Sequence, residues 1–456
     1  MTVIVPEKLQ IDYPENELFV NASTVVGILA EAGYPAYWVG GAVRDLVLGI
    51  TPGDVDIVTV ARPEQLLELF PDSELIGLSF GVVLVKFNNM SFEVATCREE
   101  RIYLDGRRPE EIKFTTDFVR DLQRRDFTVN AMLYDPQQKL VLDYTGGLQD
   151  IKRQLIRVIG DSRERFTEDY LRMFRAVRFA SRLGFELDKA AVEAITAMSC
   201  LAGKLAPERV RDELEMMLCG ASPVRALELL KQTGLLAVWL PEVDRLSGIE
   251  QPAKYHPEGD VWQHTLLMFE NLSAPASPEL AWSILLHDIG KVPAFSLDED
   301  NIPHFFGHEV MGSEMVDVIA GRLRFSNSLR ESVAHAVRNH MRFASVQSMR
   351  KAKLKRLLAE ENFAMELELH RLDCLSSNGL MGTWEFLTDC LQSMPEPELP
   401  ELLLNGRDLI KMGYTPGPEF KRMLERLMDA QLEGWLSERS QAIEWIKREY
   451  PLKNKN

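Results

Sequence analysis

The feature that most constrains the fold is a change in hydrophobic periodicity near Phe166. Before it, short apolar runs such as GVVLVKF, SFEVAT and KLVLDY alternate with turn signals and one helical stretch, PEQLLELF. This pattern predicts a mixed α/β region built on one sheet. After it, apolar residues recur with a helical period almost to the end of the chain, beginning with EDYLRMFRAVRFASRLGF. The expected fold class is therefore α+β, with a mixed-sheet head followed by all-α parts.

Length and loop composition divide the chain further. A chain of 456 residues contains two to four domains at about 100 to 200 residues per domain. Loops rich in Pro or Gly lie at Pro241, SGIEQPAKYHPEG and MPEPELPELLLNG, and such loops mark boundaries. We expect a head at 1–165, a helical neck at 166–240, a helical body at 241–395 and a helical tail at 396–456.

Composition limits the partners and the compartment. The net charge of −17 argues against a protein that coats nucleic acid indiscriminately, because such binding needs many Lys and Arg contacts to phosphate. Five scattered cysteines without a CxxC pair fit buried thiols in a reducing compartment. The acidic start of the chain and the lack of a long apolar run predict neither a signal peptide nor a membrane span. We expect a cytosolic protein, and the sequence contains no indication of its oligomeric state.

A glycine turn followed by a carboxylate pair forms the first candidate site. In YWVGGAVRD a short apolar run, Gly40 and Gly41 precede a helix start, which leaves bare backbone N–H groups suited to a phosphate. Asp54 and Asp56 begin the run DVDIVTV, and alternate residues of a strand share one face. Two such carboxylates can bind magnesium, which activates an attacking hydroxyl and stabilises departing pyrophosphate. Taken singly, the turn is more often punctuation and the acidic pair a solvated strand edge.

These residues carry a family resemblance. GGAVRD followed by DVDIV resembles the first motif of the nucleotidyltransferase superfamily, in the branch with bacterial CCA-adding enzymes and poly(A) polymerases. Further stretches resemble the flexible loop, the ribose-contacting motif and the hinge of these enzymes: 98–114, 124–131 and 143–150. The resemblance covers essentially the whole chain and implies Mg²⁺-dependent transfer of nucleotides from CTP and ATP to the 3′ end of tRNA. In that scheme Arg44 joins the glycines at the triphosphate, and Arg125, Asp126 and Asn130 hold the sugar. Glu93, on another predicted strand, adds a third carboxylate, makes a supporting contact or has no role.

A carboxylate and a guanidinium lie three residues apart where the first long helix is expected to open, in Glu168-Asp169-Tyr170-Leu171-Arg172. Asp169 and Arg172 would project from one helix face. Cytosine and adenine both place an amine beside an unprotonated ring nitrogen, so this pair accepts C and A, whereas uracil and guanine present the opposite order. The similar EDxxR motif of CCA-adding enzymes is assigned this role; Glu168 would orient Arg172, and Glu208-Arg209 resembles the motif that braces the pair. Ordinary helix N-terminal acids with an intrahelical partner are the alternative.

Basic residues supply candidate RNA contacts. Arg175, Arg178 and Arg182 repeat at roughly helical spacing, and RKAKLKR at 350–356 is the densest positive run. A strip facing the tRNA acceptor stem is one interpretation, and intrahelical ion pairs or a polar helix face are the other. The segment LLLNGRDLIKMGYTPGPEF resembles the tail of full-length CCA-adding enzymes, which is expected to bind the tRNA elbow. A capped helix pair fits this segment equally well.

All eight histidines lie in one stretch of the second half, between His256 and His370. A subset follows the H…HD…D order of the HD phosphohydrolases: His264, His287, Asp288 and Asp373. These residues are expected to bind a divalent transition metal or Mg²⁺, and His308 with His340 could complete a second metal position. A histidine in an apolar helix is usually a core residue, but the ordered set favours metal binding. Resemblance implies phosphohydrolase activity on cyclic or terminal phosphates.

Two local features separate the alternatives. Bacterial poly(A) polymerases carry a basic GRRF-like stretch where this chain has residues 75–81, LIGLSFG, and this difference favours tRNA as substrate. The loop at 98–108 is complete, which argues against an enzyme that stops after two C additions. Addition of the last A alone, and poly(A) synthesis, remain open. An alternative from a different class is an HD hydrolase with an inactive head, although the catalytic carboxylates expected of an active head are all present.

Overall fold

The computed structural model describes residues 5–77, 81–100, 112–252, 256–273, 276–393 and 399–452. The chain forms two compact units, Met1–Asp244 and Arg245–Asn456, and each is described by itself. The expected flexible loop lies mostly outside the described residues, as does part of 75–81. Among the described helices, none combines the length and the apolar character needed to span a bilayer.

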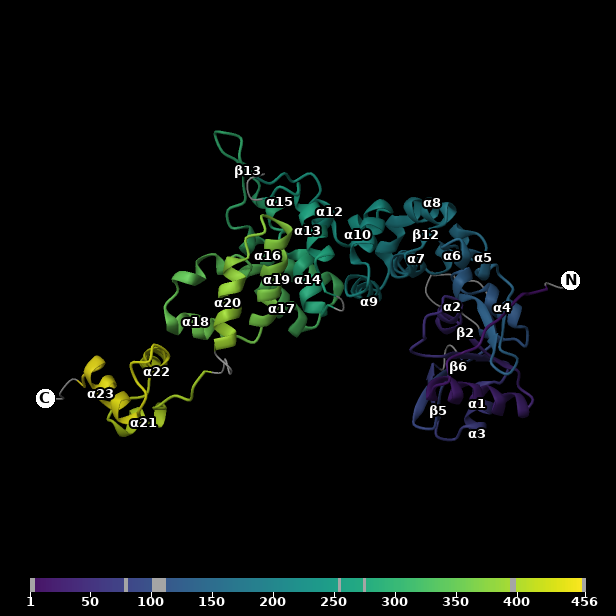
Figure 1. Cartoon of the computed structure of the whole chain (residues 1–456), viewed down its shortest axis with the longest axis horizontal. Helices are drawn as coiled ribbons and strands as arrows, with labels where there is room; N and C mark the ends of the chain where they lie inside the picture. The colour runs from purple at the N-terminus through teal and green to yellow at the C-terminus, as the bar shows by residue number, and fades with distance from the viewer. Residues whose placement is uncertain are drawn as a thin grey trace. The chain divides into compact units, whose positions relative to one another are not determined.

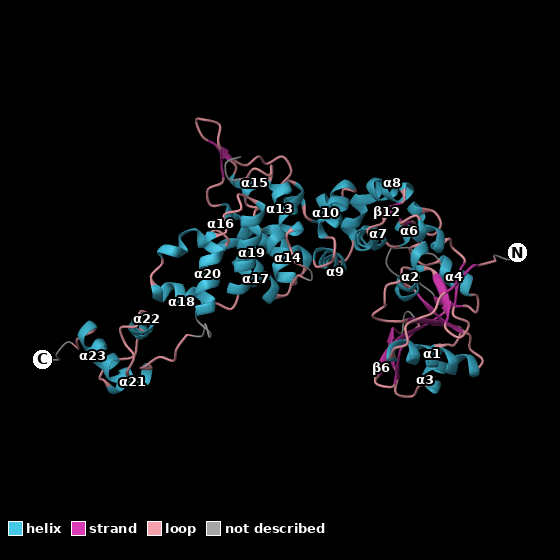
Figure 2. Ribbon diagram, in the orientation of Figure 1, coloured by secondary structure: helices cyan, strands magenta, loops and turns pink. Residues whose placement is uncertain are grey.

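Strands gather in the head (Figure 2). They form an eight-stranded sheet with strand order β1-β10-β9-β2-β3-β6-β5-β4. The strands are β1 Glu7–Gln10, β2 Ala36–Val39, β3 Asp56–Thr59, β4 Glu74–Gly77, β5 Val82–Phe87, β6 Met90–Thr96, β9 Met132–Asp135 and β10 Leu140–Asp143. A separate hairpin pairs β7 Arg98–Glu100 with β8 Ile112–Phe114. Within the large sheet β3 and β6 are parallel, and every other neighbouring pair is antiparallel.

Helices and a buried aromatic cluster stabilise this sheet. The head helices are α1 Glu17–Glu31, α2 Gly41–Val47, α3 Pro63–Leu69, α4 Phe118–Gln123, the 3₁₀ turn η1 Thr128–Asn130 and α5 Gly147–Lys152. The Asn16 side chain caps α1 by accepting from the backbone N–H of Phe19. Trp38 of β2 is fully buried, with ring centroids 5.6 Å from Phe19 and 5.1 Å from Tyr134. Each such ring removes roughly 150 to 250 Å² from water, so this cluster anchors α1 to the sheet that carries the glycine turn.

Helices follow the head within the first unit (Figure 1). They are α6 Ser162–Glu168, α7 Leu171–Leu183, α8 Lys189–Met198, η2 Ser199–Lys204, α9 Pro207–Leu218, α10 Pro223–Gln232, α11 Leu235–Trp239 and α12 Pro241–Asp244. Two short strands, β11 Leu155–Ile156 and β12 Glu186–Leu187, pair in parallel among them. Helix α7 packs on α9 and α10 and ends at Gly184, whose φ of 66° permits the left-handed turn.

The second unit begins with a helical body. Its elements are α13 Val261–Glu270, α14 Pro278–Leu286, α15 Lys291–Ala294, β13 Ser296–Leu297, β14 Pro303–His304, α16 His308–Leu323, α17 Asn327–Asn339, η3 Arg342–Ser348, α18 Lys351–Leu358, α19 Phe363–Ser376 and α20 Gly382–Ser393. Helix α14 packs on both α17 and α19, and α13 on α19, so helices distant in sequence meet around one core (Figure 1). The run 350–356 falls largely in α18, where Arg356 already pairs with Asp429 at 2.8 Å.

Three C-terminal helices complete the second unit: α21 Gly406–Lys411, α22 Pro418–Leu432 and α23 Arg439–Glu449. They enclose a small apolar core of their own that includes Leu409, Leu427 and Ile446. Asn405 forms a capping box with Asp408 at the start of α21, which agrees with the capped helices expected in this segment. The α+β expectation, with a mixed-sheet head and helical remainder, is confirmed.

Candidate nucleotide-transfer and metal sites

The glycine turn lies against the carboxylate pair because of strand register. In the antiparallel pair of β2 and β3, Val39 is opposite Asp56, so Gly40 follows directly beside that carboxylate. Gly40 has a φ of 79°, and a Cβ there would lie 3.3 Å from Asp56 Oδ2. A side chain would therefore be both strained and crowded at this position. Asp54 precedes β3, and Val55 between the two acidic residues is buried, as alternation predicts.

Glu93 comes to the same place through the parallel pair of β3 and β6. Ile57 is in register with Val94, so Asp56 and Glu93 occupy matching preceding positions on neighbouring strands. Partial removal from water, with the like charges of Asp54 and Glu93, raises the pKa of Asp56 to about 6. Three carboxylates that repel one another in this way are suited to a divalent cation, because its charge removes the repulsion.

Arg44, expected at the triphosphate, is buried with 2% of its surface exposed. Its Nη1 donates to Asn130 Oδ1 at 2.6 Å, and its Nε donates to Asp45 Oδ1 at 2.8 Å. The guanidinium carbon also lies 5.6 Å from the ring centroid of Phe179. Arg44 and Asn130 thus connect α2 with η1, and the contacts expected with triphosphate and sugar stay predictions.

The expected ribose-contacting residues are held by partners that the sequence alone did not indicate. Asp121 is buried, and its carboxylate pairs with Arg124 at 2.7 Å and Arg125 at 3.3 Å. Asp126 accepts from Arg175 at 2.8 Å. Burial opposes ionisation of Asp126, but Arg175 and a backbone N–H keep its pKa below the usual value. The spacing of four residues between Asp121, in α4, and Arg125, just past its end, was the available signal for Asp121.

The expectation that the first long helix opens at Glu168 is wrong. Glu168 ends α6, and Asp169 is an extended residue with φ −148° before α7 begins at Leu171. The break forms because the Asp169 side chain accepts from the backbone N–H of Leu171 at 3.0 Å and so competes with helical hydrogen bonding. Asp169 and Arg172 therefore lie on two sides of a helix junction.

Both members of the proposed base-selecting pair are held by ion pairs. Glu168 Oε2 accepts from Arg172 at 2.5 Å, which is the orienting contact expected from the sequence. Arg209 donates to Asp169 Oδ2 at 3.0 Å, as the resemblance implied for the bracing motif. Arg165 also pairs with Glu168 at 2.5 Å and was missed, because its place in α6 depends on the helix break.

The structure disfavours a basic strip at Arg175 and Arg178. Arg175 pairs with Asp126 at 2.7 Å, and Arg178 pairs with the buried Glu213 at 2.6 Å. Arg182, by contrast, has 57% of its side chain exposed. Two of the three arginines thus stabilise the packing of α7, and RNA contacts by them remain predictions.

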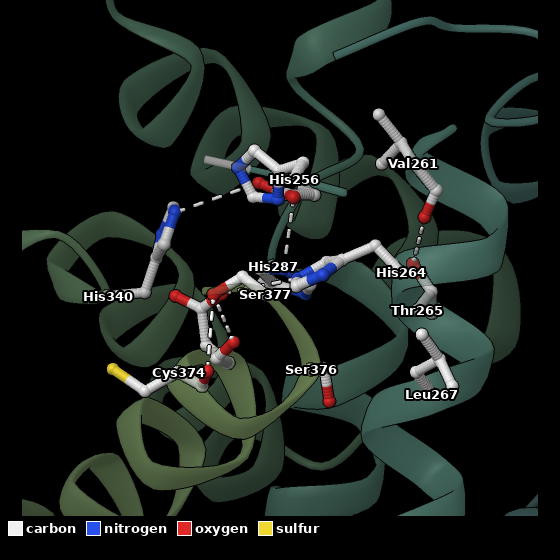
Figure 3. Close-up of polar contacts among 12 residues, drawn as sticks. His256, Val261, His264, Thr265, Leu267, His287, His340, Cys374, Ser376 and Ser377 are labelled. Atoms are coloured by element: carbon white, nitrogen blue, oxygen red, sulfur yellow. Dashed lines mark hydrogen bonds and ion pairs between the residues drawn. The ribbon is translucent and has the colours of Figure 1, made fainter. Parts of the chain in front are cut away.

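In the second unit, helix ends bring the expected metal ligands together. His264 is on α13 and Asp373 on α19, with Nε2 and Oδ1 3.2 Å apart. His287 and Asp288 follow the end of α14 directly, and His287 Nε2 lies 3.1 Å from Asp288 Oδ2. Gly290 permits the close approach of α16, since a Cβ there would lie 2.0 Å from the carbonyl oxygen of His308. Figure 3 shows the imidazoles of His264 and His287 side by side.

His308 and His340 join the same cluster. Their Nε2 atoms are 3.1 Å apart, and they lie 3.5 and 3.8 Å from Asp288 Oδ1. Among the described residues, three groups with ligand atoms mutually within 4.8 Å occur here, including His264, His287 and Asp288, and Asp288 with His308 and His340. Asp288 thus offers one carboxylate oxygen to each of two candidate metal positions.

The electrostatics suit cation binding. Burial alone would lower the pKa of His264, but the adjacent carboxylates of Asp373 and Glu258 raise it to about 9, so without a metal ion this imidazole carries a proton at pH 7 and a bound cation takes the place of that proton. Burial lowers the pKa of His340 to about 4, so its imidazole is neutral at pH 7 and can ligate metal. Burial opposes ionisation of Asp288, but His287 and Lys291 hold its pKa well below the usual value.

Two residues beside this cluster, His256 and Glu258, were not predicted from the sequence. Glu258 Oε1 lies 2.9 Å from His256 Nδ1 and 2.7 Å from His264 Nδ1. Both precede α13 in a loop, where no periodicity indicates which way a side chain points. Their closeness to His264 in the sequence was the available signal.

The fold and the two sites define a nucleotidyltransferase head joined to a helical metal-binding domain. Family profiles agree: "Poly A polymerase head domain" matches residues 36–157, "Probable RNA and SrmB- binding site of polymerase A" residues 184–246, and "HD domain" residues 260–374.

Full-length relatives identify the family. The chain is 33% identical to the CCA-adding enzyme of Bacillus subtilis (strain 168) over 434 residues, covering 94% of this chain and 98% of the relative. It is 32% identical to the CCA-adding enzyme of Geobacillus sp. (strain WCH70) over 433 residues, covering 94% and 97%. The crystal structure of the Bacillus stearothermophilus CCA-adding enzyme in complex with CTP superposes with a TM-score of 0.73 at 28% identity, covering 95% and 98%. The chain belongs to the CCA-adding enzyme family.

Proposed function

We propose that this chain adds C and A residues from CTP and ATP, without a nucleic acid template, to the 3′ end of tRNA. The observation that carries the proposal is the pairing of Asp169 with Arg209 and of Arg172 with Glu168. These contacts hold a carboxylate and a guanidinium in one region of the first unit. Cytosine and adenine both complement that combination, and uracil and guanine do not.

In the proposed reaction the 3′ hydroxyl of tRNA attacks the α-phosphate of the incoming nucleotide. Asp54 and Asp56 would hold Mg²⁺, with Glu93 as a third carboxylate; bound Mg²⁺ lowers the pKa of the attacking hydroxyl and neutralises charge on pyrophosphate. The backbone N–H groups at Gly40 and Gly41 provide donors for the triphosphate. Positioning of the two substrates contributes much of the acceleration.

We assign these steps to the four segments expected from the sequence. The head, 1–165, transfers the nucleotide, and the neck, 166–240, selects the base. The body, 241–395, binds metal, and the tail, 396–456, contacts tRNA together with exposed arginines such as Arg182. An enzyme that acts on tRNA works where tRNA is found, so we propose a cytosolic location, which subcellular fractionation tests.

The test incubates the full chain and Mg²⁺ with three tRNAs that end before CCA, within it or one base short. CTP and ATP are supplied singly and together, and the products are sized. Addition of CCA followed by a stop supports the proposal. Growth by the last A alone indicates an A-adding enzyme, and long A tails indicate a poly(A) polymerase. The Asp54→Asn, Asp56→Asn double variant is the control and should extend none of the tRNAs.

We propose a second function, metal-dependent phosphohydrolysis, for the body. The carrying observation is an excess of buried acceptors. Within the described residues, His264 Nε2, His287 Nε2 and Asp288 Oδ1 are buried and make no hydrogen bond of good geometry, although a carboxylate oxygen of Asp373 or Asp288 lies 3.2 or 3.1 Å from the two imidazole nitrogens. Lone pairs that converge in a buried site are costly unless a cation binds them. The expected result is opening of a cyclic nucleotide phosphate to its monoester and release of phosphate from a terminal nucleotide phosphate, both lost after chelation and restored by Mn²⁺ or Ni²⁺.

A further inference from the structure

The ring nitrogens of the four metal-facing histidines are not held alike. In His287, His308 and His340, Nδ1 donates to a backbone carbonyl three residues earlier. The acceptors are the carbonyl oxygens of Ile284, Phe305 and Val337, at 2.9, 2.8 and 2.6 Å. A carbonyl can only accept, so Nδ1 carries the proton and Nε2 presents a lone pair. His264 presents its Nε2 to the same cluster but donates to a carboxylate instead.

That carboxylate belongs to Glu258, which is nearly enclosed. Its side chain is 5% exposed, and Oε1 lies 2.7 Å from Nδ1 of His264. The same oxygen lies 2.9 Å from Nδ1 of His256. The two imidazole rings are almost perpendicular, with centroids 5.1 Å apart, so each directs a nitrogen at Oε1. Figure 3 shows His256 and His264 beside His287, with the His340 ring also turned toward the cluster.

We propose that Glu258 is a positioning residue for the metal site and acts through His264, with His256 as its second hydrogen-bond donor. The proposal rests on the proposed metal binding by the body. A carboxylate that accepts from Nδ1 fixes the tautomer and the ring plane of a ligand histidine. It also makes Nε2 a stronger electron-pair donor than a backbone carbonyl does. Among the four histidines, His264 is therefore the one whose ligand nitrogen is supported by a carboxylate hydrogen-bonded to Nδ1.

The arrangement makes the two candidate metal positions unequal. Glu258 supports the position that includes His264, whereas in the position formed by Asp288, His308 and His340 both histidines donate from Nδ1 to backbone carbonyls. Loss of Glu258 therefore weakens metal binding at the position that includes His264 much more than at the position that includes His308 and His340. A general loss of packing would weaken both.

The experiment titrates Mn²⁺ into metal-stripped full-length protein by calorimetry. Every sample carries Asp54→Asn and Asp56→Asn, so that the head contributes no heat. We expect two ions to bind. Glu258→Ala should reduce the affinity of one of them by about 10- to 100-fold, the range typical of lost support to a ligand histidine, and should leave the other within about threefold. Glu258→Gln retains an acceptor oxygen without the charge, so it should lower the affinity for that ion less than Glu258→Ala does.

Glu309→Ala is the matched control. The Glu309 carboxylate lies 3.6 Å from Nδ1 of His308, but that nitrogen already donates to the carbonyl of Phe305 at 2.8 Å. Its removal should leave both affinities unchanged.

The outcomes distinguish failure of the positioning role of Glu258 from failure of the proposed metal binding itself. If protein with native Glu258 binds no Mn²⁺, the proposed metal site is refuted. If two ions bind but Glu258→Ala leaves both affinities unchanged, or lowers both equally, the positioning role alone is refuted. Where circular dichroism shows Glu258→Ala to be unfolded, Glu258→Gln decides, since an unchanged pair of affinities contradicts the role.

Discussion

Replacement of Arg172 by Ala should change the preference for CTP over UTP strongly and lower the stability of the protein only slightly. Nη1 of Arg172 donates to Glu168 at 2.5 Å and to the carbonyl of Arg165 at 2.8 Å, and Nη2 donates to the carbonyl of Arg124 at 3.3 Å. A guanidinium has five N–H donors. Counting the described residues as partners, two donors remain for a base. The side chain is 11% exposed, so these donors act in a partly desolvated place.

The magnitude follows from those donors. A hydrogen bond from a charged group contributes about 1.5 to 3 kcal/mol, and every 1.4 kcal/mol is about tenfold. The kcat/KM for CTP should therefore fall by about 10- to 150-fold. UTP cannot use the same donor in this geometry, so its kcat/KM should change by less than about threefold. The loss of stability should be about 1 to 2 kcal/mol, because Glu168 keeps its ion pair with Arg165 at 2.5 Å.

The assay is single-nucleotide incorporation of CTP and UTP into tRNA that lacks CCA, with urea unfolding measured in parallel. Arg182→Ala is the control, since that side chain lies on the same helix and is 57% exposed. Its CTP to UTP ratio should match that of the native protein. An equal loss of CTP and UTP incorporation in Arg172→Ala, with the ratio unchanged, would refute base selection by this residue.

Three further predictions follow. Gly40→Ala places a Cβ 3.3 Å from Asp56 Oδ2 and should lower nucleotide transfer more than about tenfold. The control is Gly49→Ala, which has a similar φ of 73° and no atom within 4 Å; it should cost about 1 kcal/mol of stability and leave transfer intact. Equal transfer in the two variants would contradict the crowding argument. Without metal the pKa of Asp56 is raised to about 6, and Mg²⁺ binds the ionised carboxylate. The affinity for Mg²⁺ should therefore fall as the pH drops through 6 and be about tenfold lower at pH 5 than at pH 7. A Mg²⁺ affinity that calorimetry finds independent of pH would refute this. Arg178→Met leaves the buried Glu213 without its 2.6 Å partner and should lower the free energy of unfolding in urea by about 3 to 5 kcal/mol. Adding Glu213→Leu to the same chain should restore most of this loss. If the losses of the two substitutions simply add, the ion pair does not stabilise the fold.

The sequence predicted the parts of the site that depend on short spacings. Asp54 and Asp56 are two residues apart, so in an extended strand their side chains share one face, and Gly40 is part of a glycine turn. Local rules were therefore enough to find these residues. The order of His264, His287 and Asp373 was recognisable because it resembles the H…HD…D order of the HD phosphohydrolases. These features need no knowledge of which elements pack together.

Other contacts depended on tertiary structure and could not be predicted from the sequence. The burial of Arg44 by packing against Phe179 and its hydrogen bond to Asn130 could not be predicted from the local sequence. The helix break at Asp169 depends on a side chain competing with the backbone, which a periodic pattern does not reveal. Glu258 faces His264 only because the loop before α13 folds back toward that helix.

The strand order of the head also governs when it can fold during synthesis. Glu7 of β1 is paired with Asp143 of β10, and β2, which leads into the glycine turn, needs β9 as its second neighbour. At the usual elongation rate of about 5 to 20 residues per second, roughly 7 to 27 s pass between the making of the first strand and of its partner. For that time the emerging chain exposes unpaired strand edges. Helices that form locally within the neck face no such delay, so we expect the sheet that carries Asp56 and Glu93 to mature later than the neck.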